Sequence, residues 1–160
     1  LNVLHLRPGY FMENLLGQLA GVRHTGGLGS VLDGDIKLPL IATRDIGEYA
    51  TKRLLALDFK SNSHQHLLGA RDWSYNEIAG VVGKLIGKPE LKYTKLPSAQ
   101  GREVMLTGWG LSPSMADAMV EFQETVNTGK VLELCKRDEH STTPTTLEQF
   151  LPVLERVWNS

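Results

Sequence analysis

Residues 1–16, LNVLHLRPGYFMENLL, decide the fold that we predict for this chain. Val3, Leu4 and Leu6 form an apolar run of the length of a buried strand. Strand pairing should stop near Arg7, because Pro8 has no N–H to donate and glycine adopts backbone angles that other residues avoid. From Phe11 onward, apolar residues recur at helical spacing, which predicts a helix over residues 11 to about 20.

The end of this strand is a candidate binding site. In open α/β sheets, ligands bind just beyond the carboxyl ends of the strands. We therefore expect the opening strand to be buried and its end, at Pro8, Gly9 and Tyr10, to open onto a pocket. The same residues also fit an ordinary strand-to-helix turn that is packed with core aromatics.

Residues 7–15 (RPGYFMENL), 41–50 (IATRDIGEYA) and 67–79 (LLGARDWSYNEIA) follow one another at characteristic distances. Together with a short strand at 92–97, their order and spacing resemble those of NmrA-like proteins. These proteins are atypical short-chain dehydrogenase/reductase relatives that bind NAD(P). The resemblance extends over about residues 3 to 125 and depends on order rather than on any single motif.

The resemblance implies an α/β fold: the carboxyl-terminal part of a Rossmann-like NAD(P)-binding fold plus a small, mostly helical substrate portion. Residues 1–70 would be the end of the dinucleotide-binding sheet, and residues 71–160 the substrate-binding portion. No stretch resembles the strand, glycine-rich turn and helix that cradle the cofactor pyrophosphate. Residues 26–30 are rich in glycine, but no apolar strand precedes them. The chain thus resembles the carboxyl-terminal half of a larger protein.

The resemblance also assigns roles to the residues of the strand end. Pro8, Gly9 and Tyr10 would contact the cofactor, and Phe11, Met12 and Asn14 would face the substrate. From its own sequence context, Trp109 is a further candidate for the substrate pocket, because glycines flank it in a loop. It could equally be a hydrophobic plug.

No catalytic residue can be named. Tyr49 and Arg53 have the spacing of the Tyr-x-x-x-Lys couple of typical short-chain dehydrogenases, but the second residue is arginine and its place in the fold is different. His64 and His66 should face one side of a strand. Two histidines without a third ligand do not predict a metal site.

Composition limits the partners that we expect. The chain has 160 residues, of which 41% are hydrophobic and 22% charged, with 17 basic and 18 acidic side chains. This balance argues against a nucleic acid or an acidic membrane as partner, and no apolar run approaches the length of a membrane span. The lone Cys135 excludes an internal disulfide and fits a reducing compartment such as the cytoplasm. We expect a small-molecule substrate and some self-association through exposed apolar surface.

Local patterns predict the remaining elements. Asp33-Gly34 suggests a tight turn or a hairpin, and Asp45 with Glu48 suggests a helix that begins in a capping box. Ser74 and Glu77 form a second such box, and Gly87 suits the end of that helix. Further helices are expected at three places: Ser98 to Leu106; after Ser112-Pro113, with Met115, Met119, Phe122 and Val126 inward; and from Thr145, kinked or split at Pro152.

Two functions remain open from the sequence. The first is part of an NAD(P)H-dependent oxidoreductase that acts on a small apolar or quinone-like substrate. The second is a non-catalytic, dinucleotide-sensing regulatory module that binds a protein partner. A third possibility is a structural domain that binds nothing. In every case we expect this chain alone to bind NAD(P) weakly or not at all, because the pyrophosphate contributes much of the affinity for the dinucleotide.

Overall fold

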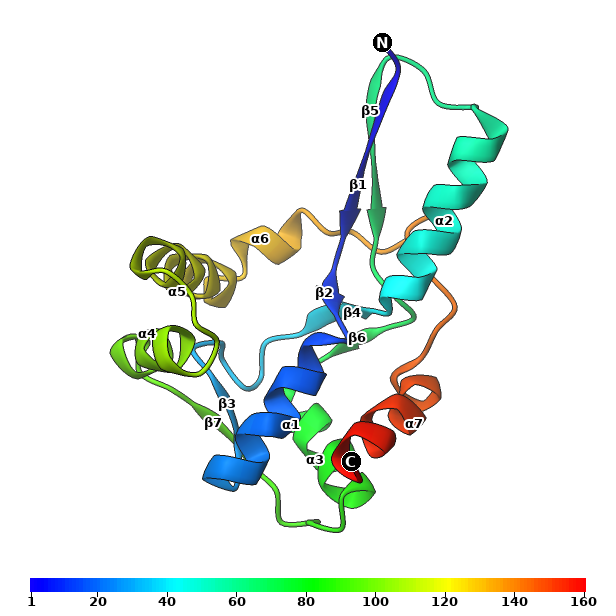
Figure 1. The fold of residues 1–160 in the computed structure, drawn as a ribbon. Coiled ribbons are helices and arrows are strands. Elements are labelled where there is room, and N and C mark those ends of the chain that lie inside the picture. Colours follow the sequence, from blue (N-terminus) through cyan, green and yellow to red (C-terminus); the bar gives the residue numbers. More distant parts are fainter. The chain divides into compact units, whose positions relative to one another are not determined.

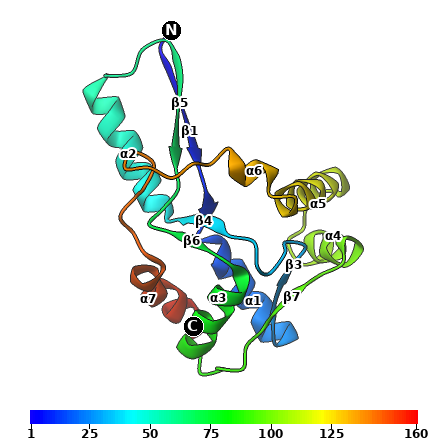
Figure 2. The same cartoon turned by 180° about the vertical axis from the view of Figure 1, so that it is seen from behind.

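The computed structural model describes all 160 residues, from Leu1 to Ser160. Strands and helices alternate along the first half of the chain, and the predicted α/β class is confirmed (Figures 1 and 2). The strands are β1 (Val3–Pro8), β2 (Tyr10–Phe11), β3 (Leu28–Ser30), β4 (Leu38–Ile41), β5 (Asn62–Leu67), β6 (Asp72–Trp73) and β7 (Tyr93–Lys95). The helices are α1 (Asn14–Thr25), α2 (Thr43–Ala56), α3 (Tyr75–Leu85), α4 (Ser98–Thr107), α5 (Pro113–Asn127), α6 (Lys130–Glu133) and α7 (Leu147–Trp158).

The chain forms two compact units, and each is discontinuous in sequence. Unit 1 comprises Leu1–Leu19, Lys37–Trp73 and Cys135–Ser160, and unit 2 comprises Ala20–Ile36 and Ser74–Leu134. One boundary lies close to the division predicted at residue 70. The units nevertheless differ from two linear segments, because the end of the chain belongs to unit 1. The assignment of cofactor and substrate roles to residues 1–70 and 71–160 stays a prediction.

Parallel pairing of β1 with β5 forms the first sheet of unit 1. His5 lies opposite His64, and the Val3 N–H donates to the Ser61 carbonyl over 2.7 Å. The predicted strand is therefore confirmed. Its predicted burial is not, because Leu4 and Leu6 are only half-buried. A strand with a single paired neighbour leaves its other edge uncovered.

Pro8 lies within β1, opposite Leu67, so the strand ends one residue later than predicted. The N–H groups of Val3 and Gly9 both donate to the β5 side. Backbone groups of a strand point alternately to its two edges, so the donor that Pro8 lacks would point away from β5. Proline therefore interrupts no hydrogen bond of this pair.

β4 is the central strand of the second sheet of unit 1, between parallel β2 and antiparallel β6. All of its residues are buried. Phe11 belongs to β2 and lies opposite Ile41. The helix predicted from Phe11 therefore begins later, at Asn14, because the paired strand extends through Phe11.

Two glycines let the ends of β1 and β5 approach β4 closely. A Cβ atom on Gly9 would lie 2.2 Å from the Pro39 carbonyl oxygen, and one on Gly69 would lie 1.7 Å from the Leu40 oxygen. Gly69 also has a φ of 71°, which favours glycine. No other residue type fits at these two positions without movement of the β4 backbone.

The start of α2 is capped by a residue from elsewhere in the sequence. Glu13 accepts hydrogen bonds from the N–H of Thr43, at 3.0 and 3.2 Å, and from its hydroxyl, at 2.6 Å. The helix starts at Thr43, after Ala42, so the predicted N-cap at Asp45 was wrong. A carboxylate near the first helical N–H groups also interacts favourably with the positive end of the helix dipole.

Asp45 instead anchors the segment before α7. Its buried carboxylate accepts the N–H of Thr145 over 3.0 Å and the hydroxyl of the same residue at the short distance of 2.5 Å. The capping box of α7 is therefore formed one residue later than predicted, by Thr146 and Gln149. α7 continues as one helix past Pro152, which is exposed, so the predicted split does not occur.

Unit 2 contains a second parallel pair, β3 with β7. The Tyr93 hydroxyl donates to the Leu32 carbonyl over 2.7 Å, and its ring stacks on Tyr75 at 4.5 Å. Residues 21–30 contain several glycines and show no helical or strand periodicity in the sequence. They form the last turn of α1 and strand β3, because tertiary pairing with β7 orders a segment whose own pattern is weak.

Asp33 and Gly34 form a turn, but not a hairpin. The Ile36 N–H donates to the Asp33 carbonyl over 3.3 Å. The flanking strands β3 and β4 do not pair with each other, since each has found other partners. The turn was therefore predicted correctly and the hairpin was wrong.

The helix α3 is the element that the sequence predicted best. Ser74 and Glu77 form the expected capping box, and Gly87 is left-handed, with a φ of 71°. Ile78 and Val82 are buried and Leu85 is half-buried. The starts of α4 and α5 are also as predicted, with Ser112 as the cap of α5.

The inner face of α5 differs from the prediction. Its buried residues are Ala116, Gln123 and Val126, whereas Met115 and Phe122 are exposed. Gln123 accepts the Val31 N–H over 3.2 Å. The buried face of α5 therefore includes a polar side chain whose oxygen binds the backbone of a segment far away in the sequence.

The packing of α3 leads to a stability prediction. Val82→Ala removes buried methyl groups, and we expect it to lower the free energy of unfolding by about 1 to 4 kcal/mol. Leu85→Ala should cost less, because Leu85 is half-buried. Urea denaturation measures both. Unchanged midpoints would contradict the assignment, and Val153→Ala on exposed surface of α7 serves as the control.

The close approach to β4 leads to a second prediction. Gly9→Ala should destabilise the protein by about 1 to 3 kcal/mol, because the new methyl group collides with the backbone of β4. Gly17→Ala is the matched control. Gly17 lies in α1 with no atom near its added Cβ, so this change should stabilise by about 0.5 to 1 kcal/mol. Thermal melting that ranks the two variants in the opposite order would refute the close approach of Gly9 to the β4 backbone.

Candidate functional site

The carboxyl ends of β1 and β5 lie together, because the two strands are parallel. Gly9 closes the pair with a hydrogen bond from its N–H to the Leu67 carbonyl over 2.8 Å. The chain then turns to β4, where the Met12 N–H donates to the Ile41 carbonyl over 2.8 Å. This strand end, all within unit 1, is the place where open α/β sheets bind ligands.

The structure brings most of the predicted site residues to this strand end. Pro8, Gly9 and Tyr10 are consecutive and half-buried. Phe11 and Asn14 are exposed, the former to 36%. Phe11 is thus an apolar side chain available to a ligand beside the three residues proposed for the cofactor.

Two predicted substrate residues are placed differently. Met12 is fully buried, so its side chain packs in the core and would reach a ligand only after leaving it. Trp109 belongs to unit 2, in the loop between α4 and α5, where it is 47% exposed. The roles of both residues stay predictions.

Arg137 holds the end of β5 in place. Its guanidinium donates to the carbonyl oxygens of Leu68, over 3.0 Å, and of Gly69, and it forms an ion pair with Asp72. Asp72 is partly exposed, so the ion pair itself contributes little. The two contacts provide hydrogen-bond donors for the carbonyl oxygens of the turn that follows the strand. Sequence reasoning missed this residue, because nothing near Arg137 in the sequence signals a contact with residues 68–72.

The titratable groups near the strand pair show no nucleophile. Burial raises the pKa of the Cys135 thiol, and the nearby Asp72 raises it further, so the reactive thiolate is disfavoured. Burial lowers the pKa of His66, with contributions from Arg7 and His64. The rings of His64 and His66 meet edge to face at 5.6 Å.

No group of three or more His, Cys, Asp or Glu side chains is arranged to hold a metal ion. No helix is both long and apolar enough to cross a membrane.

The Arg53 guanidinium lies 5.9 Å from the centre of the Tyr49 ring, an arrangement of packing rather than of proton transfer.

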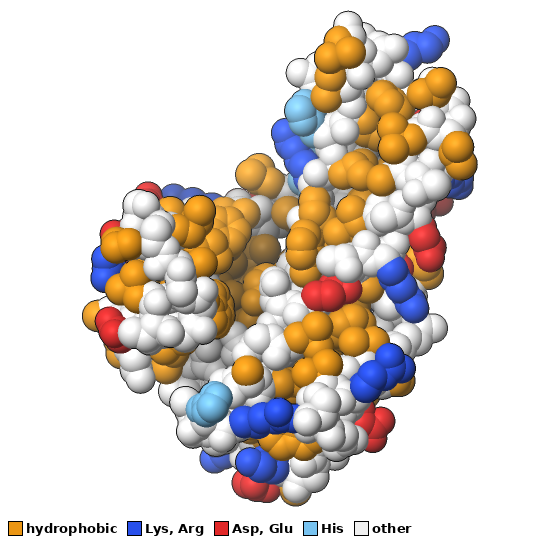
Figure 3. Space-filling view, viewed as in Figure 1, with side chains coloured by type: hydrophobic (Ala, Val, Ile, Leu, Met, Phe, Trp, Pro, Cys, Tyr) orange, Lys and Arg blue, Asp and Glu red, His pale blue; other side chains and the backbone are white.

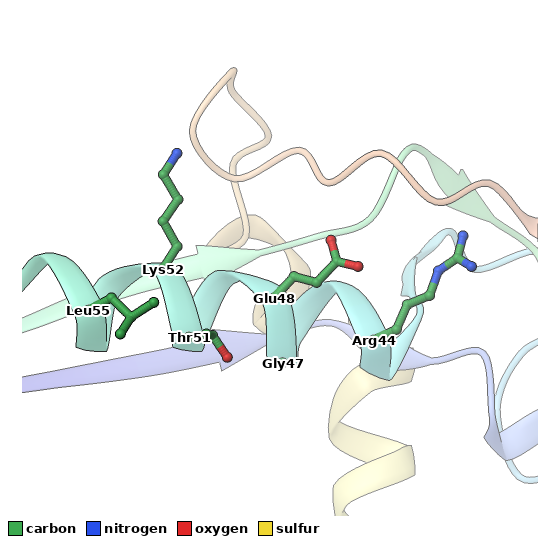
Figure 4. Close-up of a pocket in the computed structure, with 6 residues that line it drawn as sticks. All are labelled: Arg44, Gly47, Glu48, Thr51, Lys52 and Leu55. Atoms are coloured by element: carbon green, nitrogen blue, oxygen red, sulfur yellow. The ribbon is translucent and has the colours of Figure 1, made fainter.

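A separate depression of about 570 Å³ lies on α2. Figure 4 shows the side chains of Arg44, Glu48 and Lys52 on one side of the helix and those of Thr51 and Leu55 on the other. It is open and shallow, and none of the predicted site residues lines it.

Comparison with known proteins identifies relatives, although no family model matches the chain. An NAD(P)H azoreductase of Xenophilus azovorans is 31% identical over 117 residues, which cover 73% of this chain and 40% of that protein. An uncharacterized oxidoreductase of Bacillus subtilis is 28% identical, with 97% of this chain and 54% of that protein covered. Festuclavine dehydrogenase of Aspergillus fumigatus is 26% identical, with coverages of 78% and 43%. The chain thus spans about half the length of the curated relatives it matches.

Two solved structures share the fold. The triphenylmethane reductase of Citrobacter sp., solved in complex with NADP(H), has a TM-score of 0.73 at 14% identity, with 96% of this chain and 53% of that chain covered. A nucleoside-diphosphate-sugar epimerase of Staphylococcus aureus has a TM-score of 0.67 at 18% identity, with 94% and 52% covered. These neighbours show that the fold is Rossmann-like. The comparisons together support the NAD(P)-binding reductase superfamily, whereas the narrower NmrA-like resemblance stays a prediction.

Proposed function

We propose that this chain forms part of an NmrA-like, NAD(P)H-dependent oxidoreductase that acts on a small apolar or quinone-like substrate. The observation that carries the proposal is the strand end at Pro8, Gly9 and Tyr10, with the exposed Phe11 beside it. Relatives named as an azoreductase and a triphenylmethane reductase support a substrate with aromatic rings.

The proposed division of labour places the cofactor and the substrate on neighbouring residues. Pro8, Gly9 and Tyr10 would contact the nicotinamide end of NAD(P), which supplies the hydride. Phe11 and Asn14 would contact the substrate from the side facing solvent, with Met12 behind them. Trp109, in the loop after α4 of unit 2, is proposed separately as a residue that contacts a substrate. The protein's own task is to orient the two molecules and to exclude water.

The pyrophosphate end of the cofactor has no evident place on this chain. Helix N-termini bind phosphate through their free N–H groups. Glu13 already occupies the start of α2, and Glu77 that of α3, each with a carboxylate bound to a backbone N–H. We therefore propose that the chain alone binds NAD(P) weakly or not at all.

Calorimetric titration of the 160-residue chain with NADPH tests this proposal. We expect a dissociation constant far above 1 μM, the value that corresponds to roughly −8 kcal/mol. Tight 1:1 binding at about 1 μM would contradict the weak-binding proposal. It would leave the reductase assignment standing, because it would reveal a phosphate site that the sequence and the fold do not suggest.

Nuclear magnetic resonance tests the site itself. At millimolar concentration, nicotinamide mononucleotide should shift the amide signals of Gly9, Tyr10 and Phe11, whereas adenosine monophosphate should not. Phe11→Ala should weaken the binding of a small quinone such as menadione several-fold, and Val157→Ala in α7 is the exposed control. Shifts confined to other regions would overturn the assignment of the site.

A non-catalytic, dinucleotide-sensing module that binds a protein partner is the second candidate. It is favoured because Pro8, Gly9 and Tyr10 offer no pair of groups for acid–base catalysis: only Tyr10 among them has a titratable side chain. Hydride transfer needs no protein acid in principle, so this observation does not decide between the two. Oxidation of NADPH by menadione distinguishes them when it is measured with the longer protein of which we propose this chain to be a part, because only the reductase accelerates it.

The remaining partner assignments are also proposals. We propose a small-molecule substrate and no nucleic-acid or membrane partner, on the balance of 17 basic and 18 acidic residues. We also propose self-association through exposed apolar surface.

A further inference from the structure

The helix α2 is capped by a residue that lies far away in the sequence. Its own N-cap position is occupied by Ala42, and no side chain there accepts a hydrogen bond. The helices α3, α5 and α7 each begin instead with a serine or threonine that accepts a hydrogen bond from the helix backbone. For α2 the acceptor is the Glu13 carboxylate, 30 positions before Thr43. A cap of this kind connects two segments, which a local cap does not.

Glu13 makes its bonds from the turn that joins β2 to α1. Its two carboxylate oxygens accept the Thr43 N–H, at 3.0 and 3.2 Å, and one of them also accepts the Thr43 hydroxyl at 2.6 Å. The preceding residue is fixed as well, because Met12 is buried and its N–H donates to the Ile41 carbonyl. Two consecutive residues thus join the ends of β2 and β4, and the starts of α1 and α2 lie side by side (Figures 1 and 2).

The start of α2 is itself anchored. The buried Asp45, in its first turn, accepts the N–H and the hydroxyl of Thr145. The side chain of Arg44 donates to the same hydroxyl oxygen over 3.0 Å. A displacement of the turn between β2 and α1 would therefore break the bonds of Glu13 rather than carry the helix along. Glu13 holds that turn against an anchored helix.

Phe11 and Asn14 flank the two fixed residues. Both side chains are exposed, and hydrophobic atoms lie at the surface where β1 leads into β2 (Figure 3). An exposed side chain has little packing around it, so its position depends mainly on the backbone that carries it. The bonds of Glu13 fix this backbone between Phe11 and Asn14.

The bonds of Glu13 also compensate its charge. A carboxylate without partners would be unfavourable beside an apolar ligand, because removing a bare charge from water is costly. The two Thr43 donors and the positive end of the α2 dipole direct the carboxylate toward the helix. An apolar ring can then lie against Phe11 without an unpaired charge next to it.

We propose that Glu13 is a positioning residue for the substrate. Its carboxylate, bound to the start of α2, holds Phe11 and Asn14 in the arrangement in which they contact an apolar or quinone-like ring. The inference deepens the proposed function and rests on it, since that function assigns the substrate to Phe11 and Asn14. Glu13 acts through these two neighbours and exchanges no proton with the substrate.

Titration of the 160-residue chain with menadione, followed by nuclear magnetic resonance, tests this role. Glu13→Ala should raise the dissociation constant of menadione at least about fivefold, because Phe11 and Asn14 are no longer preorganised. Glu13→Gln should retain most of the affinity, since its amide oxygen can still accept hydrogen bonds from Thr43.

Nicotinamide mononucleotide provides the second readout. Its affinity should be the same in Glu13→Ala as in the wild-type chain, because Gly9 is held by its own bond to the Leu67 carbonyl. Loss of quinone binding with unchanged nucleotide binding is the result that a general weakening of the fold would not produce.

Glu77→Ala is the matched control. The Glu77 carboxylate also accepts a backbone N–H at the start of a helix, that of Ser74 over 2.8 Å, but this cap lies in unit 2. Its removal should destabilise the fold without changing the affinity for menadione. Circular dichroism confirms that each variant is folded at the temperature of the titration.

Three outcomes would overturn the inference. Glu13→Ala that binds menadione as tightly as the wild-type chain would show that Glu13 positions nothing. An equal loss of affinity for menadione and for nicotinamide mononucleotide would show a general effect on the fold. If menadione leaves the signals of Phe11 and Asn14 unchanged in the wild-type chain, the proposed function itself fails, and this inference fails with it.

Discussion

The closeness of three backbone segments in unit 1 is the constraint on which the candidate site depends. Gly9 follows β1, Gly69 follows β5, and both lie against the carbonyl oxygens of β4. A side chain at either position would push β4 away and separate Tyr10 and Phe11 from their strand partners. The site residues are therefore held by the absence of two Cβ atoms as much as by any attractive contact.

Polar anchors from the end of the chain complete this arrangement. Arg137 satisfies two carbonyl groups of the turn after β5. Asp45, near the start of α2, accepts two hydrogen bonds from Thr145. A buried carboxylate is costly unless its oxygens are paired, so these bonds fix where the last segment enters unit 1. Neither contact has a counterpart in the local sequence pattern.

The sequence predicted those elements that are determined by short-range chemistry. The capping box of Ser74 and Glu77, the left-handed Gly87 and the proline-led start of α5 all depend on residues within one turn of each other. The α/β class, the opening strand and the resemblance to NAD(P)-binding proteins also followed from order and spacing. The predictions failed where a distant partner decided the outcome.

Particular residues show the reason. Glu13 rather than Asp45 caps α2. Gln123 lies on the buried face of α5 and binds the Val31 N–H, and β7 pairs with the weakly patterned residues 28–30. Each partner lies at least 30 positions away, and no local rule names it. For the candidate site, the sequence indicated the strand end but not Arg137. The burial of Met12 was also missed, because apolar character alone does not distinguish a pocket wall from a core.

The discontinuity of unit 1 has a consequence for the order in which the protein can fold during synthesis. A chain emerges from the ribosome at about 5 to 20 residues per second, and domains generally fold as units. Unit 2 is complete once Leu134 has emerged, whereas unit 1 still lacks Cys135–Ser160. The strand end at Gly9 and Gly69 must therefore wait for Arg137 and Thr145, although its own residues are made before these two. A ribosome that pauses before residue 135 would hold the candidate site in an unfinished state.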